Sequence, residues 1–150
     1  MQQPSVGEES FLLESNPARS DCAAPLLSVL VPFYDTSPTA LLEALTRQAA
    51  GNPDVEFVFA DDGSSDARYG RAVGEAMSRS TVPAGLLTAR RNVGRAAIRN
   101  ALTRAARGTY VLFVDCDLQP GSPEFLNRWF EVVRKGGTDV GYGGFRMRPC

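Results

Sequence analysis

Short apolar runs alternate with amphipathic segments along most of the chain. Five runs have the length and composition of strands, and they cover residues 26–35, 55–66, 84–89, 109–115 and 139–145. The second run passes from strand into turn at Asp61-Asp62-Gly63-Ser64. Residues 1–25 are polar and show no period, so we expect a flexible leader there, followed by one domain over residues 26–150.

The segments between these runs have the pattern of helices. Ser37-Pro38 offers a cap and a first-turn proline, and the apolar residues that follow share one helical face: Leu41, Leu42, Leu45 and Ala49. Further helices are expected over 67–79 with Ser65 or Asp66 as cap, over 93–106 with Asn92 as cap, and from Ser122-Pro123 to Lys135. Strands alternating with helices predict the α/β class, with a mainly parallel, Rossmann-like sheet flanked by helices on both faces.

Acidic residues follow three of the predicted strands: Asp35, then Asp61 and Asp62, then Asp115 and Asp117. The carboxyl ends of parallel strands meet at one edge of a sheet, and ligands bind at that edge in such folds. We therefore expect a site there. Taken singly, each acidic strand end also has the composition of an ordinary turn.

Asp115 and Asp117 are separated by one residue at the end of the most hydrophobic run. If the strand continues through them, both side chains lie on one side and Cys116 points the other way. Two such carboxylates suit Mg²⁺ or Mn²⁺, which prefer oxygen ligands, and two solvated loop carboxylates are the alternative. For Asp61-Asp62 the alternatives are a capped turn and a hydrogen bond accepted from a donor such as a nucleobase imide.

A basic segment precedes Asp115. Between Ala76 and Val114 there is no Asp or Glu, whereas there are seven arginines: Arg79, Arg90, Arg91, Arg95, Arg99, Arg104 and Arg107. Three of these, Arg91, Arg95 and Arg99, are four residues apart, which places them near one helical face. A helix start with arginines is suited to an anion. A solvated arginine stripe is the alternative, but the position beside the acidic strand end favours a bound diphosphate.

The composition narrows the class of protein. The net charge of −1 gives no bulk electrostatic case for binding nucleic acid. There is no His, and the three Cys are odd in number without metal-ligand spacing, so a reducing compartment is expected. Neither a signal-peptide pattern nor an apolar run of roughly 20 residues is present, so we expect a cytoplasmic protein, or one at the cytoplasmic face of a membrane, without a membrane segment in this chain.

The stretches SVLVPFYD, FADDGSSD and NVGRAAIRNALTRAARGTYVLFVDCDLQP, in this order and spacing, resemble the nucleotide-sugar-binding half of family-two glycosyltransferases. The resemblance covers about residues 27–145 and implies the GT-A fold, truncated to its donor-binding half. It implies that Pro32, Tyr34 and Asp35 border the uridine or other nucleoside of the donor. It also implies that Asp62 meets the base, with Asp61 nearby. The family commonly has Asn where this chain has Asp35.

For the diphosphate and sugar, the resemblance implies that Gly94, Arg95 and Arg99 line the nucleotide and its phosphates. Asp115 would approach the ribose or the sugar. Asp117 would ligate Mn²⁺ or Mg²⁺. The implied ligand is a nucleoside-diphosphate sugar, with a UDP-sugar favoured, and the acceptor is a hydroxyl of an unknown glycan, lipid or protein. Polysaccharide biosynthesis is a common setting for such enzymes.

The resemblance further implies inversion at the anomeric carbon by a carboxylate base in the second half of the family fold, beyond the position that matches Gly144. The later carboxylates Glu124, Glu131 and Asp139 do not match that base. We therefore expect that the acceptor half is absent from this sequence, and that the chain binds a donor with or without turnover.

Two other classes also have strand-end aspartates. Haloacid-dehalogenase-like phosphatases carry such a pair on the first strand, whereas Asp115 and Asp117 follow the fourth predicted strand. A receiver-like module requires an acidic pair on the first strand and a lysine after the fifth, and Lys135 is misplaced for that role. Both patterns fit less well than the glycosyltransferase pattern.

Overall fold

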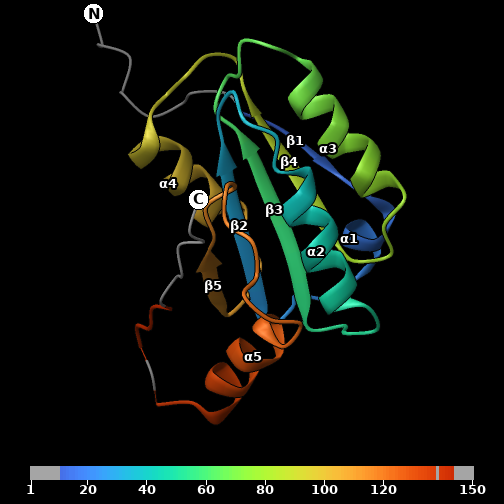
Figure 1. Ribbon diagram of the computed structural model, residues 1–150, viewed down its shortest axis with the longest axis vertical. Helices are drawn as coiled ribbons and strands as arrows, with labels where there is room; N and C mark the ends of the chain where they lie inside the picture. Colours follow the sequence, from blue (N-terminus) through green and yellow to red (C-terminus); the bar gives the residue numbers. More distant parts are fainter. Residues whose placement is uncertain (1–10, 138, 144–150) are drawn as a thin grey trace, which may run out of the picture.

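The computed structural model describes residues 11–137 and 139–143. Their strands form one five-stranded sheet in the order β1-β4-β3-β2-β5 (Figure 1). The strands are β1 (Phe11–Ser15), β2 (Leu27–Phe33), β3 (Val55–Asp61), β4 (Ala84–Ala89) and β5 (Tyr110–Phe113). All neighbouring pairs are parallel except β1 with β4, which is antiparallel. The predicted α/β class with a mainly parallel sheet is confirmed.

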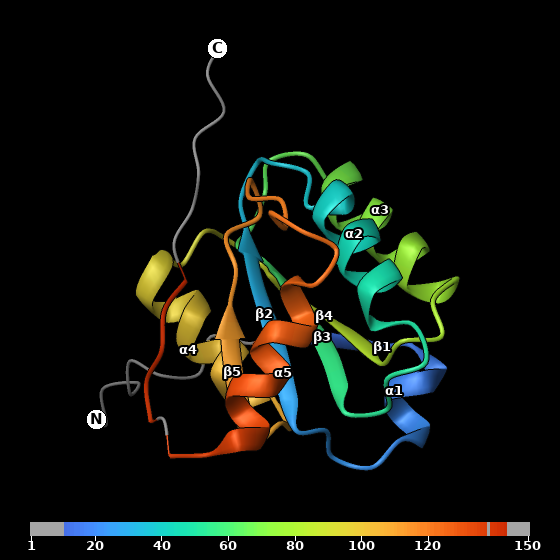
Figure 2. The ribbon, with the colours of Figure 1, turned by 60° about the horizontal axis from the view of Figure 1, so that its bottom comes forward.

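Helices cover both faces of this sheet. They are α1 (Pro17–Asp21), α2 (Thr39–Ala49), α3 (Arg68–Ser78), α4 (Arg95–Ala105) and α5 (Phe125–Lys135). The helices α2, α3 and α5 pack on one face, while α4 packs on the other, as Figures 1 and 2 show. None of the helices in the described ranges is long and apolar enough to span a bilayer.

Alternation along the central strands divides the core into two layers. Val29, Val31 and Phe57 face α2, α3 and α5, whereas Leu30 and Val58 face α4. All are completely buried. The strands β2 and β3 are therefore apolar on both faces, which is the pattern of central strands in a parallel sheet.

The expectation of an unstructured leader over residues 1–25 is wrong for residues 11–21. β1 adds an antiparallel edge strand to β4, and α1 follows it. The side chain of Asn16 accepts hydrogen bonds from the backbone N–H groups of Arg19 and Ala84, and donates to Met77 and Val82. Polar residues in this segment suggested exposure, but Asn16 is buried with its hydrogen bonds satisfied.

Arg19 is buried as well, and its partner is Glu56 near the start of β3. Glu56 has no exposed surface, and it accepts hydrogen bonds from Arg19 Nε at 3.1 Å and Arg107 Nε at 2.9 Å. The hydroxyl of Ser28 donates to it at 2.7 Å. This ionic cluster joins the N-terminal segment to the chain between α4 and β5.

The predicted strand over 139–145 is also wrong within the described residues. Residues 139–143 have no strand structure, and residues 144 and 145 lie outside the described ranges. Val140 and Tyr142 are 85% and 93% exposed, so the apolar residues that suggested a strand have no packing partner here.

The chain reverses its winding direction at the centre of the sheet. From β2 it proceeds outward through β3 to β4, and then returns to place β5 on the other side of β2. Ligands of open α/β folds bind beyond the carboxyl ends of the strands at such a reversal. The topology therefore predicts a binding site beyond the ends of β2 and β5.

Candidate donor-binding site

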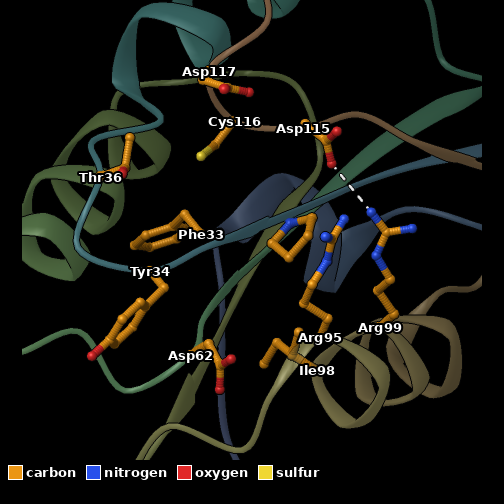
Figure 3. Close-up of a pocket in the computed structure, with 11 residues that line it drawn as sticks. Phe33, Tyr34, Thr36, Asp62, Arg95, Ile98, Arg99, Asp115, Cys116 and Asp117 are labelled. Carbon is orange, nitrogen blue, oxygen red and sulfur yellow. Dashed lines mark hydrogen bonds and ion pairs between the residues drawn. The ribbon is translucent and has the colours of Figure 1, made fainter.

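A pocket of about 330 Å³ opens at this position. It is lined by the last residues of β2, by residues that follow β2, β3 and β5, and by the start of α4: Pro32, Phe33, Tyr34, Thr36, Asp62, Arg95, Ile98, Arg99, Asp115, Cys116 and Asp117 (Figure 3). Of the ten site residues predicted from the sequence, the pocket contains seven: Pro32, Tyr34, Asp62, Arg95, Arg99, Asp115 and Asp117. The structure thus brings residues that are far apart in the sequence to one edge of the sheet.

Asp35 does not line the pocket. Its carboxylate accepts hydrogen bonds from the backbone N–H and the hydroxyl of Ser65, at 2.7 and 2.8 Å. Its own backbone N–H donates to the Ser64 hydroxyl. Asp35 has a φ of 48°, in the left-handed region where Asp and Asn are enriched among non-glycine residues. The residue joins the β2–α2 loop to the β3–α3 turn, which explains why a short amide or carboxylate side chain suits this position.

Asp61 and Asp62 diverge. Asp61 ends β3, accepts a hydrogen bond from the backbone N–H of Ser64, and lines a second cavity of about 660 Å³ that also borders β1, β4 and α3. Asp62 lines the first pocket, although only 5% of the residue is exposed. Of this acidic pair, only Asp62 is therefore placed at the predicted site.

The carboxylate of Asp62 is bound by the loop before α4. The backbone N–H groups of Val93 and Gly94 donate to Oδ1 and Oδ2 at 2.7 and 3.2 Å. Asn92, predicted as the cap of this helix, instead donates its amide to Asp62. Gly94 is the N-cap, with a φ of 91°, and it does not line the pocket. The resemblance implied that Gly94 lines the nucleotide and its phosphates, whereas its backbone N–H donates to Asp62.

The arginines of α4 bring positive charge to the pocket. Figure 3 shows Arg95 and Arg99 extending from the helix toward Asp115. Arg99 Nη2 lies 3.2 Å from Asp115 Oδ1, and its guanidinium lies over the Phe113 ring, 5.2 Å from the centroid. Arg91 precedes the helix, which begins at Arg95, so the predicted shared helical face holds for Arg95 and Arg99 alone of the three.

The second acidic pair lies in a turn and not on a strand. β5 ends at Phe113, and the backbone N–H of Leu118 donates to the carbonyl of Asp115. Alternation of side chains therefore does not apply, and Cys116 lines the pocket together with both aspartates. Burial raises the pKa of the Cys116 thiol, and the negative charges of Asp117 and Asp115 raise it further. The thiol is thus kept protonated.

The carboxylates at this turn could supply only some of the ligands of a metal ion. Asp115 is paired with Arg99, whereas Asp117 makes no hydrogen bond or ion pair with another residue of the described chain. The described ranges contain no group of three His, Cys, Asp or Glu side chains that could hold a metal ion. One or two carboxylates suit Mg²⁺ or Mn²⁺ that keeps water ligands and takes substrate phosphate oxygens, and do not suit a metal held by protein alone.

Sequence reasoning missed four residues that line the pocket: Phe33, Thr36, Ile98 and Cys116. Phe33, Thr36 and Cys116 lie next to predicted site residues, so adjacency was the available signal. Ile98 lies one helical turn after Arg95 and gave no signal beyond its apolar character. It contributes a buried wall under the arginines.

Several known proteins match most of this chain. The protein named uncharacterized glycosyltransferase EpsJ, from Bacillus subtilis strain 168, is 32% identical over 125 residues, which cover 82% of this chain and 35% of the relative. A poly(ribitol-phosphate) beta-glucosyltransferase from Bacillus spizizenii is 29% identical over 129 residues, which cover 78% of this chain and 18% of the relative. The chain thus spans about a third or less of the length of these relatives.

Solved structures show the same fold. S. aureus TarS 1-349 in complex with UDP-GlcNAc has a TM-score of 0.65 and 26% identity, over 81% of this chain and 37% of that one. The mannosyltransferase PcManGT from Pyrobaculum calidifontis, in complex with GDP-Man and Mn²⁺, has a TM-score of 0.61. The match covers 71% of this chain and 33% of that one. Its 24% identity supports the fold alone.

The family model named Glycosyl transferase family 2 matches residues 28–150. This range begins in β2 and includes every residue that lines the pocket. The match begins after β1 and α1. The chain belongs to glycosyl transferase family 2.

Proposed function

We propose that the pocket binds the nucleoside diphosphate of a sugar donor, and that the full-length protein transfers the sugar to an acceptor hydroxyl. The observation that carries this proposal is the meeting of Asp62, the α4 arginines and the Asp115–Asp117 turn in one pocket at the reversal point of the sheet. A nucleoside diphosphate presents ring N–H donors at one end and negative charge at the other, and the pocket offers complementary groups for both.

The nucleoside end of the donor would lie between Tyr34 and Asp62. Tyr34 is 48% exposed at the pocket rim, so its ring is accessible for stacking on a base. The carboxylate of Asp62 is held in place by backbone N–H groups and is suited to accept from an imide N–H. Pro32 adds a rigid apolar contact. The UDP-GlcNAc and UDP complexes of TarS support a UDP-sugar as the donor.

The diphosphate would lie against Arg95 and Arg99. Guanidinium groups bind phosphate oxygens in paired hydrogen bonds, and two of them neutralise much of the charge that develops on a departing diphosphate. Asp117 would hold Mn²⁺ or Mg²⁺, with Asp115 beside it toward the ribose or sugar. The cation, when bound, would supply further stabilisation of the departing diphosphate.

Transfer with inversion requires a carboxylate base for the acceptor hydroxyl. The pocket carboxylates have other partners or roles, since Asp62 is bound by loop amides, Asp115 pairs with Arg99, and Asp117 is assigned to the cation. Glu124 and Glu131 belong to α5 or its start and do not line the pocket. We therefore propose that the base comes from outside the described residues, and that this chain alone binds donor without transferring sugar.

The setting proposed for the full-length protein is polysaccharide biosynthesis, because one relative is named as a poly(ribitol-phosphate) glucosyltransferase. A location in the cytoplasm or at the cytoplasmic face of a membrane, where donor sugars would be available, belongs to the same proposal. The haloacid-dehalogenase-like phosphatase alternative is not favoured, because Asp115 follows an edge strand of a family 2 domain and lies in a turn with Arg99 as its partner.

Calorimetric titration with UDP, GDP and TDP in the presence of Mn²⁺ tests the proposal. We expect UDP to bind most tightly. A folded sample that binds none of the three would contradict the donor-site assignment. A turnover assay of UDP release from UDP-sugars, performed on this chain and on the full-length protein with acceptor glycans, separates an active enzyme from a domain that binds donor only.

A further inference from the structure

Asn92 does not line the pocket, yet it contacts the residue at the base-binding end. Its Nδ2 donates to the main-chain oxygen of Asp62 at 3.2 Å and to Oδ2 of the same residue at 3.3 Å. We infer that Asn92 is a positioning residue, which holds the Asp62 carboxylate and the α4 arginines in fixed relation. This inference rests on the proposed donor site and specifies how its two ends are held together.

The contacts around Asp62 involve three consecutive residues of the loop before α4. In addition to the Asn92 amide, the backbone N–H of Val93 donates to Oδ1 at 2.7 Å and that of Gly94 to Oδ2 at 3.2 Å. Because Asp62 is only 5% exposed, these hydrogen bonds replace most of its hydration. Asn92 contributes a side-chain donor, and this amide contacts both the main-chain oxygen and the carboxylate of Asp62.

The same loop is joined tightly to the turn after β3. A Cβ on Gly63 would lie 2.3 Å from the carbonyl carbon of Arg91 and 2.5 Å from the backbone nitrogen of Asn92. Only the absence of a side chain at Gly63 permits this approach. The loop is therefore in contact with the end of β3 through both backbone packing and the Asn92 amide.

A displacement of this loop would move the arginines, because α4 starts immediately after it. Gly94 adopts a φ of 91°, and its carbonyl accepts the first helical hydrogen bond from Ile98 at 3.0 Å. Arg95 is the first residue of the helix, and Arg99 follows one turn later. Since the loop and the first turn form one continuous unit, Asn92 acts on the phosphate-binding side of the pocket as well as on Asp62.

The first test compares Asn92→Ala with Asn100→Ala. Asn100 is an exposed residue of α4, and its side chain makes no hydrogen bond with the described part of the chain, so it is a matched control. In the presence of Mn²⁺, we expect UDP affinity to fall about tenfold in Asn92→Ala, as follows when a hydrogen bond to a charged group is lost at a binding site. Asn100→Ala should bind UDP like the wild type.

Hydrogen exchange gives a readout that does not depend on ligand. The amide protons of Val93 and Gly94 should exchange faster in Asn92→Ala than in the wild type, while Asn100→Ala leaves them unchanged. Thermal melting of each variant shows whether the whole domain is still folded. A general loss of stability would accelerate exchange throughout the sheet, whereas a loosened loop accelerates it locally.

A second variant, Asn92→Asp, keeps the shape but replaces the donor with a carboxylate facing Asp62. Two carboxylates in contact cannot both ionise at low cost, so one of them takes up a proton as the pH falls. The protonated form restores a donor. The affinity of Asn92→Asp for UDP, divided by that of the wild type at the same pH, should therefore rise as the pH is lowered.

The outcomes separate this inference from the donor-site proposal. Weaker UDP binding, faster local exchange in Asn92→Ala and a pH-dependent ratio in Asn92→Asp support the positioning role. Wild-type affinity in Asn92→Ala, with unchanged exchange of Val93 and Gly94, overturns it. If the wild type binds no nucleoside diphosphate, the donor-site proposal fails, and the exchange rates still decide whether Asn92 holds the loop.

Discussion

Arg99 and Asp115, which both line the pocket beyond β2 and β5, form an ion pair with 3.2 Å between Nη2 and Oδ1. The pair joins α4 to the turn after β5. Both side chains are partly exposed, at 36% and 55%, so water screens their attraction. In the proposed donor complex, such a weak pair would let the guanidinium exchange its carboxylate partner for a phosphate.

Replacement of Arg99 by Ala should weaken UDP binding about tenfold, because one charge-assisted contact to the diphosphate is lost. Stability should change by less than about 1 kcal/mol, since the ion pair is exposed. Calorimetry and urea unfolding measure the two effects. Arg104→Ala is the control, because Arg104 is an exposed arginine of the same helix. Equal UDP affinity in both variants would exclude a phosphate contact for Arg99.

Gly63 and Gly51 both have positive φ, of 69° and 76°, but only Gly63 is in close contact with another backbone segment. Gly51→Ala should cost about 1 kcal/mol from the left-handed conformation alone. Gly63→Ala should cost several times more, because its Cβ would overlap Arg91, and it should also weaken UDP binding by displacing the loop before α4. Urea unfolding and calorimetry on both variants test this. Similar losses in the two variants would argue against the close approach.

Much of the fold followed from the sequence because its signals are local. The apolar runs that became β2, β3 and β4 alternate regularly with helical patterns, and the acidic strand ends indicated the binding edge. β1 was missed for a physical reason. Two of its three apolar residues, Leu12 and Leu13, are exposed, and the strand is stabilised by pairing with β4, whose residues lie far along the chain.

The site was predicted less completely than the fold, because the direction of each side chain depends on tertiary contacts. Asp61 and Asp62 are adjacent and chemically identical, yet they line different cavities. The direction of Asp62 is fixed by the loop 92–94, thirty residues later. Similarly, the end of β5 at Phe113 placed Asp115 and Asp117 in a turn, where strand alternation does not hold. Neither feature has a local sequence signal.

Glu56 makes stability depend on pH. Burial raises the pKa of Glu56, but hydrogen bonds from the Arg107 backbone N–H, the Ser28 hydroxyl and the Arg107 guanidinium lower it, as does the charge of Arg19. The net result is a pKa below the ordinary value of 4.5. The unfolded chain therefore takes up a proton more readily than the folded one. The stabilisation by Glu56 is complete above pH 4.5 and is lost as the pH falls through the folded-state pKa.

Removal of this carboxylate leaves two arginines without their buried partner. Glu56→Ala should lower the free energy of unfolding by about 3 kcal/mol at neutral pH, which is typical when one partner of a buried ion pair is lost. Urea unfolding at neutral and acidic pH measures this, and the difference between wild type and variant should shrink in acid. Glu131→Ala, an exposed residue of α5, should have little effect. A pH-independent difference would contradict the role assigned to Glu56.

The most direct test of the donor site is a calorimetric titration of UDP with and without Mn²⁺, on the wild type, Asp117→Ala and Asp21→Ala. Asp21 is an exposed aspartate at the end of α1 that does not line the pocket, and it serves as the control. We predict that Mn²⁺ strengthens UDP binding in the wild type and Asp21→Ala, and that this strengthening disappears in Asp117→Ala. Equal Mn²⁺ dependence in all three proteins, or no UDP binding by the folded wild type, would contradict the account.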